Sequence, residues 1–153
     1  QVIPFATDEL ALVLPPNHQF TKSKELSKED LYSLGFITLD TQSTTRKVVD
    51  QLLSSSGLDV QRLHIEMELN SLEAIKNAVQ ANLGAAFLPV VSIERELLGG
   101  SLHRPIVADL EVKRELKVIT NPGRYSSRAA EAFTQDILPL FASSVSPLCN
   151  GQN

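Results

Sequence analysis

The centre of the chain alternates between short apolar runs and longer segments of helical periodicity. Residues 36–39, 62–69 and 85–88 predict short strands, since their apolar residues are continuous or alternate. Between these strands, apolar residues recur at helical spacing, first as Val48, Val49, Leu52 and Leu53 and then as Leu72, Ile75 and Val79. This β-α-β-α-β order favours a small α/β sandwich with a largely parallel sheet, because helical crossovers join parallel strands and cover the sheet.

Polar residues mark where the predicted helices begin, and glycines mark where they end. Residues 27–30 resemble a capping box that opens a short helix, and residues 70–73 are a second plausible one. Gly57 and Gly84 are the predicted ends of the two central helices. We also expect a short helix over 92–98, before the next pair of glycines.

The flanking segments do not fit this central unit. Further strands are predicted over 7–14, 102–107 and 111–120. They suggest a second subdomain, most of which we expect to be missing on the N-terminal side, since Gln1 is not a natural start.

A closing helix is predicted to begin after Ser126 or Ser127, with Pro139 kinking or shortening it. Its expected buried face consists of Phe133, Ile137 and Phe141. Residues 143–153 are expected to form a loose tail.

Composition excludes several classes of protein. The net charge of −4 opposes DNA binding by this segment itself, since DNA-binding modules carry a basic excess that neutralises phosphates. No apolar run approaches the ~20 residues that span a bilayer, and no signal peptide opens the chain. The single cysteine, Cys149, cannot form an internal disulfide, so we expect a reducing cytoplasm.

Small polar residues follow the first central strand, at the place where open α/β sheets bind ligands. They are Thr38, Asp40, Gln42, Ser43, Thr44, Thr45 and Arg46. The free N–H groups of a helix's first turn attract anions, and hydroxyls and a guanidinium add donors. Helix capping is the more frequent role of such hydroxyls, but three in a row plus Arg46 exceed what one cap requires. The segment therefore predicts an anion site that needs no metal and no cofactor.

Two shorter segments complete the candidate site. Asn70 and Ser71 again lie between a strand and a helix, although a capping box explains them more simply. Phe87, Leu88 and Pro89 end the third central strand, which should come close to both loops.

No catalytic constellation is evident. The histidines His18, His64 and His103 lie far apart and have no metal-ligand neighbours at useful spacing. No nucleophile elbow, phosphate-binding loop or dinucleotide fingerprint occurs. Glu66 and Glu68 share a strand face, which is usually a solvated one, and Cys149 lacks a positioned base. We therefore do not expect an enzyme.

Several stretches resemble the effector domains of LysR-type transcriptional regulators. The most specific is EMELNSLEAIKNAVQANLGAAFLP at 66–89, with its strand, capped helix, glycine and short apolar strand. ELALVLPPNHQF at 9–20, DLYSLGFITL at 30–39, ELKVITN at 115–121 and AAEAFTQDILPLF at 129–141 also match. ITLDTQSTTRKVVDQLL and ITNPGRYSSRAAEAF look like the branch that regulates the RuBisCO operon and carbon assimilation.

The resemblance implies a fold like that of type II periplasmic binding proteins, with two α/β subdomains joined by two crossing strands. Residues 1–19 would end subdomain I and form the first crossing strand, and 20–110 would form effector subdomain II. Residues 111–142 would form the second crossing strand and the return helix, and 143–153 a disordered tail. The effector would lie in the cleft between the subdomains.

The same resemblance implies partners. The effector would be an anionic metabolite such as ribulose 1,5-bisphosphate, 2-phosphoglycolate or 2-oxoglutarate. DNA would be bound only through an N-terminal helix-turn-helix absent from this chain, the protein would form dimers or tetramers in the cytoplasm or plastid stroma, and no membrane would be involved.

Three alternatives remain open at this point. A solute-binding protein of a transporter would share the fold, and an upstream helix-turn-helix would exclude it. A small α/β hydrolase or lyase would need a catalytic group that we do not find. A pure oligomerisation module would bind no ligand at residues 40–46.

Overall fold

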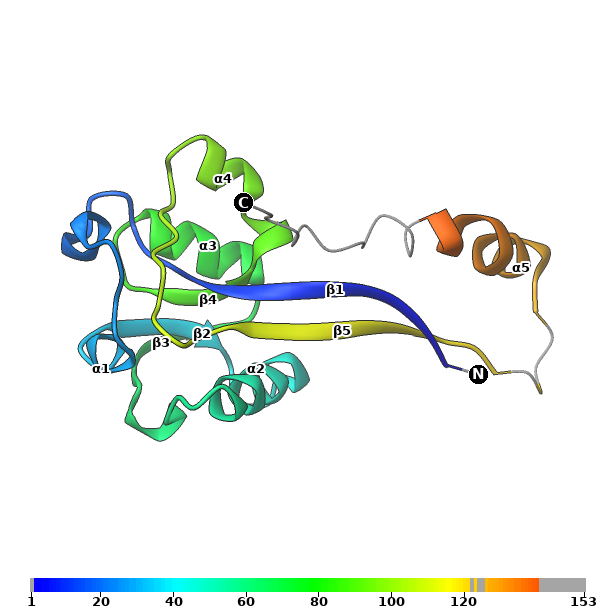
Figure 1. Cartoon of the computed structure of the whole chain (residues 1–153), viewed down its shortest axis with the longest axis horizontal. Coiled ribbons are helices and arrows are strands. Elements are labelled where there is room, and N and C mark those ends of the chain that lie inside the picture. Colours follow the sequence, from blue (N-terminus) through cyan, green and yellow to red (C-terminus); the bar gives the residue numbers. More distant parts are fainter. Residues whose placement is uncertain (1, 122, 124–125, 141–153) are drawn as a thin grey trace, which may run out of the picture. The chain divides into compact units, whose positions relative to one another are not determined.

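The computed structural model describes residues 2–121, 123 and 126–140 (Figure 1). The chain divides into two compact units, which we call unit 1 (Gln1–Asp8 and Arg114–Asn153) and unit 2 (Glu9–Lys113). Two long strands, β1 (Val2–Val13) and β5 (Val112–Ile119), contain residues of both units. The other elements of unit 2 are α1 (Lys28–Leu31), β2 (Gly35–Leu39), α2 (Thr44–Ser55), β3 (His64–Leu69), α3 (Leu72–Gln80), β4 (Ala86–Pro89) and α4 (Glu94–Leu98).

The strands of unit 2 form a mixed sheet whose centre is parallel. β2 pairs in parallel with β3, with Leu39 opposite Leu69. A parallel bridge joins β2 to Ala85, just before β4; the Ala85 N–H donates to the Gly35 carbonyl at 2.8 Å. β4 pairs antiparallel with β1, and β5 lies along the other edge of β1. The predicted parallel β-α-β-α-β centre is confirmed, and β1 enters it in the opposite direction.

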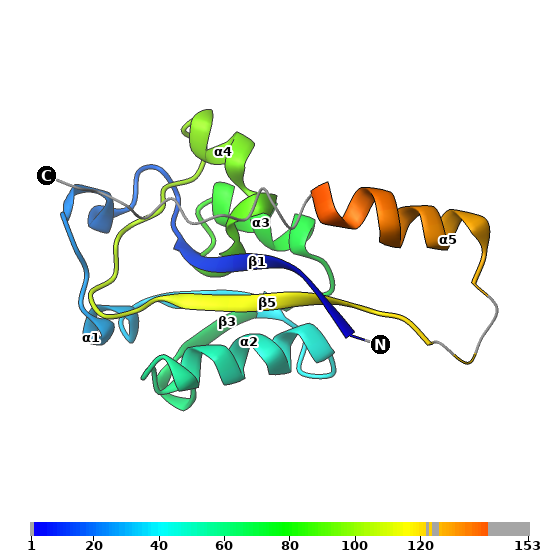
Figure 2. The same cartoon turned by 45° about the vertical axis from the view of Figure 1, so that its right-hand side comes forward.

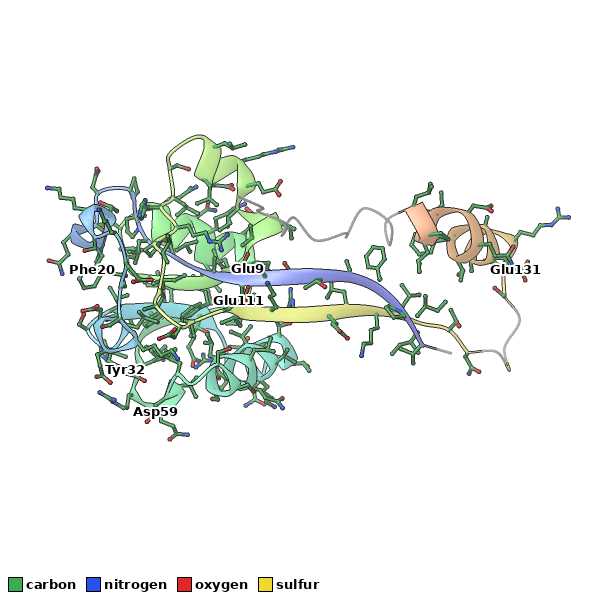
Figure 3. All side chains as sticks on the ribbon, in the orientation of Figure 1. Glu9, Phe20, Tyr32, Asp59, Glu111 and Glu131 are labelled. Carbon is green, nitrogen blue, oxygen red and sulfur yellow. The ribbon has the colours of Figure 1, made fainter. Side chains whose placement is uncertain are left out.

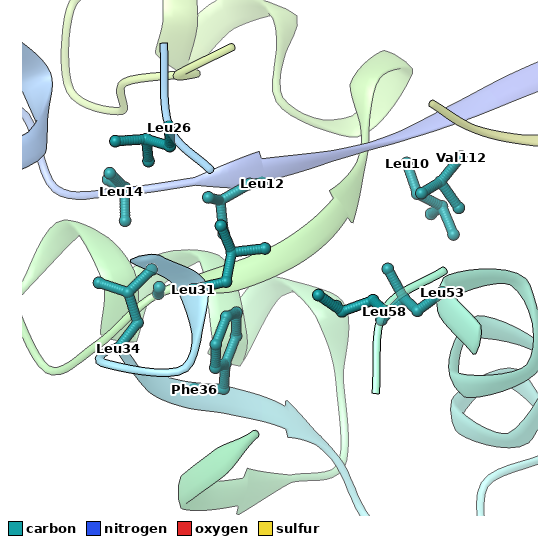
Figure 4. Close-up of a cluster of buried hydrophobic side chains, with 11 residues drawn as sticks. Leu10, Leu12, Leu14, Leu26, Leu31, Leu34, Phe36, Leu53, Leu58 and Val112 are labelled. Atoms are coloured by element: carbon teal, nitrogen blue, oxygen red, sulfur yellow. The ribbon is translucent and has the colours of Figure 1, made fainter. Parts of the chain in front are cut away.

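Apolar side chains cover both faces of this sheet, because successive residues of a strand point to opposite sides. Phe36 and Leu12 belong to one buried cluster, which also holds Leu53 of α2 (Figure 4). Ile37 and Val13, their neighbours in sequence, belong to a second cluster with residues of α3. Figure 2 accordingly shows α2 and α3 on opposite sides of the strands.

Close backbone contact between β2 and the start of β4 requires a glycine. A Cβ atom on Gly84 would lie 2.7 Å from the carbonyl oxygen of Gly35, well inside van der Waals contact. The chain reaches this point from the end of α3 through Asn82, whose φ of 63° is left-handed. Asn82 therefore makes the turn after α3, and the prediction that Gly84 ends the helix is wrong; Gly84 instead permits strand pairing.

The helix starts are partly as predicted. The capping box of α1 is confirmed, since the Ser27 and Asp30 side chains each accept the other residue's N–H. The second capping box is wrong. Ser71 rather than Asn70 caps α3, with its Oγ accepting the Ala74 N–H at 3.1 Å, and Glu73 turns to Lys76 instead.

Contacts around Tyr32 anchor α1 (Figure 3). The Tyr32 hydroxyl accepts the N–H of Asp59 at 2.9 Å, and both residues are labelled side by side in Figure 3. The Arg62 guanidinium lies 3.9 Å from the centre of the Tyr32 ring and pairs with Glu29 at 3.0 Å. The hydrogen bond with Glu29 raises the pKa of Arg62. These contacts join α1 to the turn that precedes β3.

Two predicted strands differ from those found. β1 begins at Val2 rather than at residue 7. The predicted strand over 102–107 is wrong: this segment makes only isolated bridges, from His103 to Leu14 and from Val107 to Leu26. Pro105 lies between these bridges, and a proline cannot donate to a strand ladder.

The closing helix begins as α5 (Arg128–Ala132), capped by Ser127, and continues through a π-helical segment, Phe133–Ile137. Pro139 follows that segment without ending the helix, because a proline removes one N–H and a wider π turn accommodates the loss. The prediction that Phe133 and Ile137 are buried is wrong, since they are 43% and 40% exposed, whereas Leu138 is buried. Phe141, Cys149 and the predicted tail lie outside the described residues.

Lys76 ties α3 to α4. Its Nζ lies 2.8 Å from Glu73 and 2.9 Å from Glu96, and it also donates to the Ser92 carbonyl at 3.4 Å. The hydrogen bond with Glu73, and to a smaller extent the one with Glu96, raises the pKa of Lys76, and the bond from Lys76 lowers the pKa of Glu96.

Within the described residues, no helix is long and apolar enough to cross a membrane.

Gly84→Ala should destabilise the protein by roughly 1–3 kcal/mol, because the new methyl group overlaps the Gly35 carbonyl and forces the strands apart. Urea unfolding measures the change. Gly123→Ala is the control, since its Cβ would meet its nearest neighbour at an ordinary 3.4 Å. An equal effect of both substitutions would contradict the close approach.

Glu96→Gln should make folding less sensitive to acid. Lys76 holds the pKa of Glu96 below its ordinary 4.5, so this carboxylate stabilises the folded state at higher pH, and the contribution disappears as the pH falls through the lower folded value. Between about pH 6 and about pH 3, the wild type should lose more free energy of unfolding than the variant. Glu94→Gln, an exposed change on the same helix, should behave like the wild type.

Candidate functional site

The carboxyl ends of the parallel strands meet at one edge of the sheet. Leu39 and Leu69 are in register at the ends of β2 and β3, and the Asp40 N–H donates to the Leu69 carbonyl at 3.1 Å. The loops that begin at Asp40 and at Asn70 are therefore adjacent, and each leads into a helix N-terminus. β4 runs parallel to β2, so Pro89 ends at the same edge.

At the N-terminus of α2, one hydroxyl is a cap and two are free. Ser43 is the capping residue, with its Oγ accepting the Arg46 N–H at 3.4 Å. Asp40 Oδ1 accepts the Gln42 N–H at 2.9 Å, which tightens the preceding turn. Thr44 and Thr45 are exposed, and their hydroxyls have no hydrogen-bond partner within the described residues. These two hydroxyls can therefore reach a ligand.

Arg46 is engaged inside the protein. Its Nε lies 2.9 and 2.7 Å from the two oxygens of Asp50, and its Nη1 donates to the Leu39 carbonyl at 3.0 Å. Glu68 of β3 lies 3.7 Å away, and the Arg46 side chain is only 13% exposed. This guanidinium thus clamps α2 to the ends of β2 and β3, and any anion would compete with two carboxylates for it.

The remaining candidate residues divide between surface and core. Asn70 is exposed, and its side chain makes no hydrogen bond within the described residues, while Ser71 caps α3. Thr38 is half-buried and donates only a long bond, 3.4 Å, to the Leu39 carbonyl. Phe87 stacks on Phe36 with ring centres 5.7 Å apart, and Leu88 and Pro89 are buried in unit 2. The structure therefore brings the candidate residues to one edge but gives the strand residues packing roles.

Two cavities occur away from the N-termini of α2 and α3. One of about 200 Å³ lies at the opposite end of β2, next to Gly35, Gly84 and His18. Another of about 110 Å³ lies between β1 and the segment 104–110 and includes Phe87. Neither is lined by residues 40–46 or 70–71.

The histidines do not form a metal centre. Nδ1 of His18 accepts the Phe20 N–H at 3.2 Å, and burial lowers the pKa of His18. His64 is a surface histidine that lies 3.0 Å from Glu66. Among the described residues, no group of three or more His, Cys, Asp or Glu side chains could hold a metal ion.

One ion pair could not be predicted from the sequence. Asp8 of β1 and Arg114 of β5 are separated by 106 residues, yet Arg114 Nε and Nη2 donate to Asp8 Oδ2 at 2.9 and 2.6 Å. Asp8 is followed by Glu9, and Arg114 lies between Lys113 and Glu115, so neither motif nor spacing indicates which of these charges pair. Only the pairing of the two strands brings these side chains together.

The chain is similar to known regulators over most of its length. It is 59% identical over 142 residues to a "Probable RuBisCO transcriptional regulator" of Trichormus variabilis, a match that covers 93% of the chain and 42% of that protein. A protein of the same description from Porphyra purpurea is 56% identical over 141 residues, covering 92% of the chain and 44% of the relative. The chain thus spans less than half the length of these relatives.

Structural and family comparisons agree. The regulatory domain of CcmR from Synechocystis PCC6803, solved in complex with 2-PG, matches with a TM-score of 0.78 at 22% identity, over 92% of this chain and 66% of that one. The predicted α/β fold of LysR regulatory domains is confirmed by this likeness. A family model described as the LysR substrate binding domain matches residues 1–141. The chain therefore belongs to the LysR substrate binding domain family.

Proposed function

We propose that the chain is the effector-binding part of a LysR-type transcriptional regulator that senses an anionic metabolite and controls genes of CO₂ fixation and carbon assimilation. The observation that carries this proposal is the N-terminus of α2, where Thr44 and Thr45 are exposed beside the loop that begins at Asn70. Free N–H groups and hydroxyls at a helix N-terminus bind carboxylates and phosphates without a metal. Candidate effectors are ribulose 1,5-bisphosphate, 2-phosphoglycolate and 2-oxoglutarate.

The relatives support the class of effector. Proteins described as RuBisCO transcriptional regulators share more than half of the residues of this chain. The CcmR regulatory domain, which shares the fold, was solved in complex with 2-PG. In our proposal Thr38, Asp40, Gln42, Asn70 and Ser71 line the same edge. Arg46 stabilises that edge, and Phe87, Leu88 and Pro89 support it through their packing in unit 2.

The mechanism that we propose is a population shift. Residues 20–110 would form the effector subdomain, and an effector that binds one arrangement of the subdomains more tightly would favour it. In a dimer or tetramer, this shift would change the spacing of DNA-binding heads carried elsewhere in the full-length regulator. That regulator would act where its target genes are, in the cytoplasm or the plastid stroma.

A thermal-shift titration of the full-length regulator tests the effector class. The panel contains ribulose 1,5-bisphosphate, 2-phosphoglycolate, 2-oxoglutarate and inorganic phosphate. A ligand at about 100 times its Kd should add about 2.7 kcal/mol of stability, which a melting curve resolves. A saturable shift with one organic anion and little with phosphate is expected. If no compound shifts the melting curve, the proposed effector binding is replaced by the alternative that the chain is an oligomerisation module without a ligand.

Thr45→Ala should weaken effector binding about ten- to a hundredfold, because one hydrogen bond to a charged group is lost while the exposed position tolerates alanine. Arg46→Ala should also lower stability, since it leaves Asp50 and the Leu39 carbonyl without their donor. Isothermal titration measures binding, and urea unfolding separates the two effects. Thr21→Ala, at a threonine far from this edge in the sequence, is the control; unchanged affinity in Thr45→Ala contradicts the assignment.

A further inference from the structure

The register between β2 and β3 shifts by one residue at Glu66. Phe36 of β2 lies opposite Ile65 of β3. The next residue of β2, Ile37, lies opposite Met67, so Glu66 is the extra residue of a bulge. Ile65 packs against the cluster that contains Phe36, and Met67 against the one that contains Ile37, although residues two apart on a regular strand share a face. A bulge re-aims a side chain, and bulges are frequent beside functional sites.

A glycine beside the bulge makes room for the Glu66 side chain. A Cβ atom on Gly35 would lie 2.4 Å from Cγ of Glu66 and 3.0 Å from its Oε1, so a larger residue at position 35 would push this side chain aside. Oε1 of Glu66 lies 3.0 Å from Nε2 of His64, whereas Oε2 has no hydrogen-bond partner among the described residues. The bulge and the glycine therefore hold a carboxylate with an open acceptor over the first residue of β2.

Glu66 is one of the residues that line the cavity of about 200 Å³ at the start of β2, which we call the Glu66 cavity. A site for a single water needs only about 10–15 Å³, so this cavity is large enough for a small organic molecule. Pro15, Leu34 and Leu83 give it an apolar wall. All of its described lining residues belong to unit 2.

The Glu66 cavity carries a negative charge. Glu66 is the only acidic or basic side chain besides His18 among the described residues that line it. Burial lowers the pKa of His18 from its ordinary 6.5, so this imidazole is largely neutral at pH 7 and does not oppose a cation. Asn82, the other polar side chain of the lining, is uncharged. One carboxylate thus faces a space whose opposite wall is apolar.

We infer that the Glu66 cavity binds a small organic monocation that consists of an ammonium group on a short aliphatic chain. The ammonium would donate to Oε2 of Glu66, and the chain would lie against Leu34 and Leu83. An ammonium has three donors and no acceptor, which suits a carboxylate that only accepts. This inference goes beyond the proposed function and does not rest on it, because the cavity and the proposed anion site lie at opposite ends of β2.

A bound cation would also touch the connection between the two halves of the sheet. Gly35 and Ala85, whose backbone atoms form the 2.8 Å bond that joins them, both line the Glu66 cavity. A ligand that binds only the folded state stabilises it by mass action. Occupation of the cavity should therefore raise the melting temperature of the regulator, which is a readout independent of DNA binding and of the anionic effector.

A thermal-shift titration of the full-length regulator with propyl-, butyl- and pentylammonium chloride tests the site, with sodium chloride keeping the ionic strength constant. Butan-1-ol and butyrate, which have a similar chain and no positive charge, are the controls. We expect a saturable rise in melting temperature with at least one alkylammonium ion and with neither control. The inference is overturned if no alkylammonium ion gives a saturable rise, or if a control gives an equal one.

A variant of the carboxylate locates the cation. Glu66→Gln keeps the shape of the side chain and removes its charge. Solvent screens an ion pair at a position that is 53% exposed, so the Kd for the alkylammonium ion should rise by only about five- to tenfold, as measured by isothermal titration. Glu94→Gln makes the same change at an exposed carboxylate outside the cavity and should bind like the wild type. Wild-type affinity in Glu66→Gln would overturn the inference.

A second variant tests the apolar wall. In the wild type, affinity should increase from propyl- to pentylammonium, because each further methylene leaves water. Leu83→Ala should reduce this dependence on chain length. Leu98→Ala, the same change at a leucine that is 90% exposed and outside the cavity, should retain it. The same dependence in both variants would place the chain elsewhere and contradict the assignment.

The two ligand classes separate this inference from the proposed function. If an organic anion shifts the melting curve and no alkylammonium ion does, only the cation site is overturned. If an alkylammonium ion binds in a manner that depends on Glu66 and no anion in the panel binds, the cation site is supported and the proposed function is overturned.

Discussion

The backbone bond between Ala85 and Gly35 connects the two halves of the sheet in unit 2. On one side of it lie the parallel strands β2 and β3, and on the other lie β4, β1 and β5. The bond is short because Gly84 has no Cβ; a methyl group there would lie 2.7 Å from the Gly35 carbonyl. With the halves joined, Phe36 and Ile37 can reach opposite cores, and α2 and α3 can cover opposite faces (Figure 2).

The same connection sets the chemistry of the sheet edge. Parallel strands end on one side, so the helices that follow them begin there, and their free N–H groups gather at that edge. Arg46 contributes to this edge by holding it together rather than by exposing its charge. Asp50, Glu68 and the Leu39 carbonyl surround its guanidinium. Within the described residues, the exposed side chains of Thr44, Thr45 and Asn70 at this edge keep donors without a hydrogen-bond partner.

Two ion pairs in the chain illustrate opposite uses of charge. Lys76 has three acceptors around one ammonium, and these contacts join two helices. Asp8 and Arg114 satisfy each other only in part, because one carboxylate oxygen has no donor among the residues that the structure describes. The contacts of Lys76 leave its ammonium well satisfied, whereas the buried Oδ1 of Asp8 carries a desolvation cost that the bond to Arg114 does not offset.

By itself, the sequence determined the local elements and the family. Hydrophobic periodicity located the helices around Leu53 and Val79, and the Ser27–Asp30 pattern located a cap, because these features depend on residues within one or two turns of each other. The tertiary structure decided what depends on distant residues. Only the tertiary structure shows that Arg46 holds α2 against β2 and β3, and that residues 102–107 make isolated bridges instead of the predicted strand. It also shows that Asp8 pairs with Arg114, which is 106 residues away in the sequence. A side chain's partner is set by which strands and helices become neighbours, and that information is not present in any local stretch of sequence.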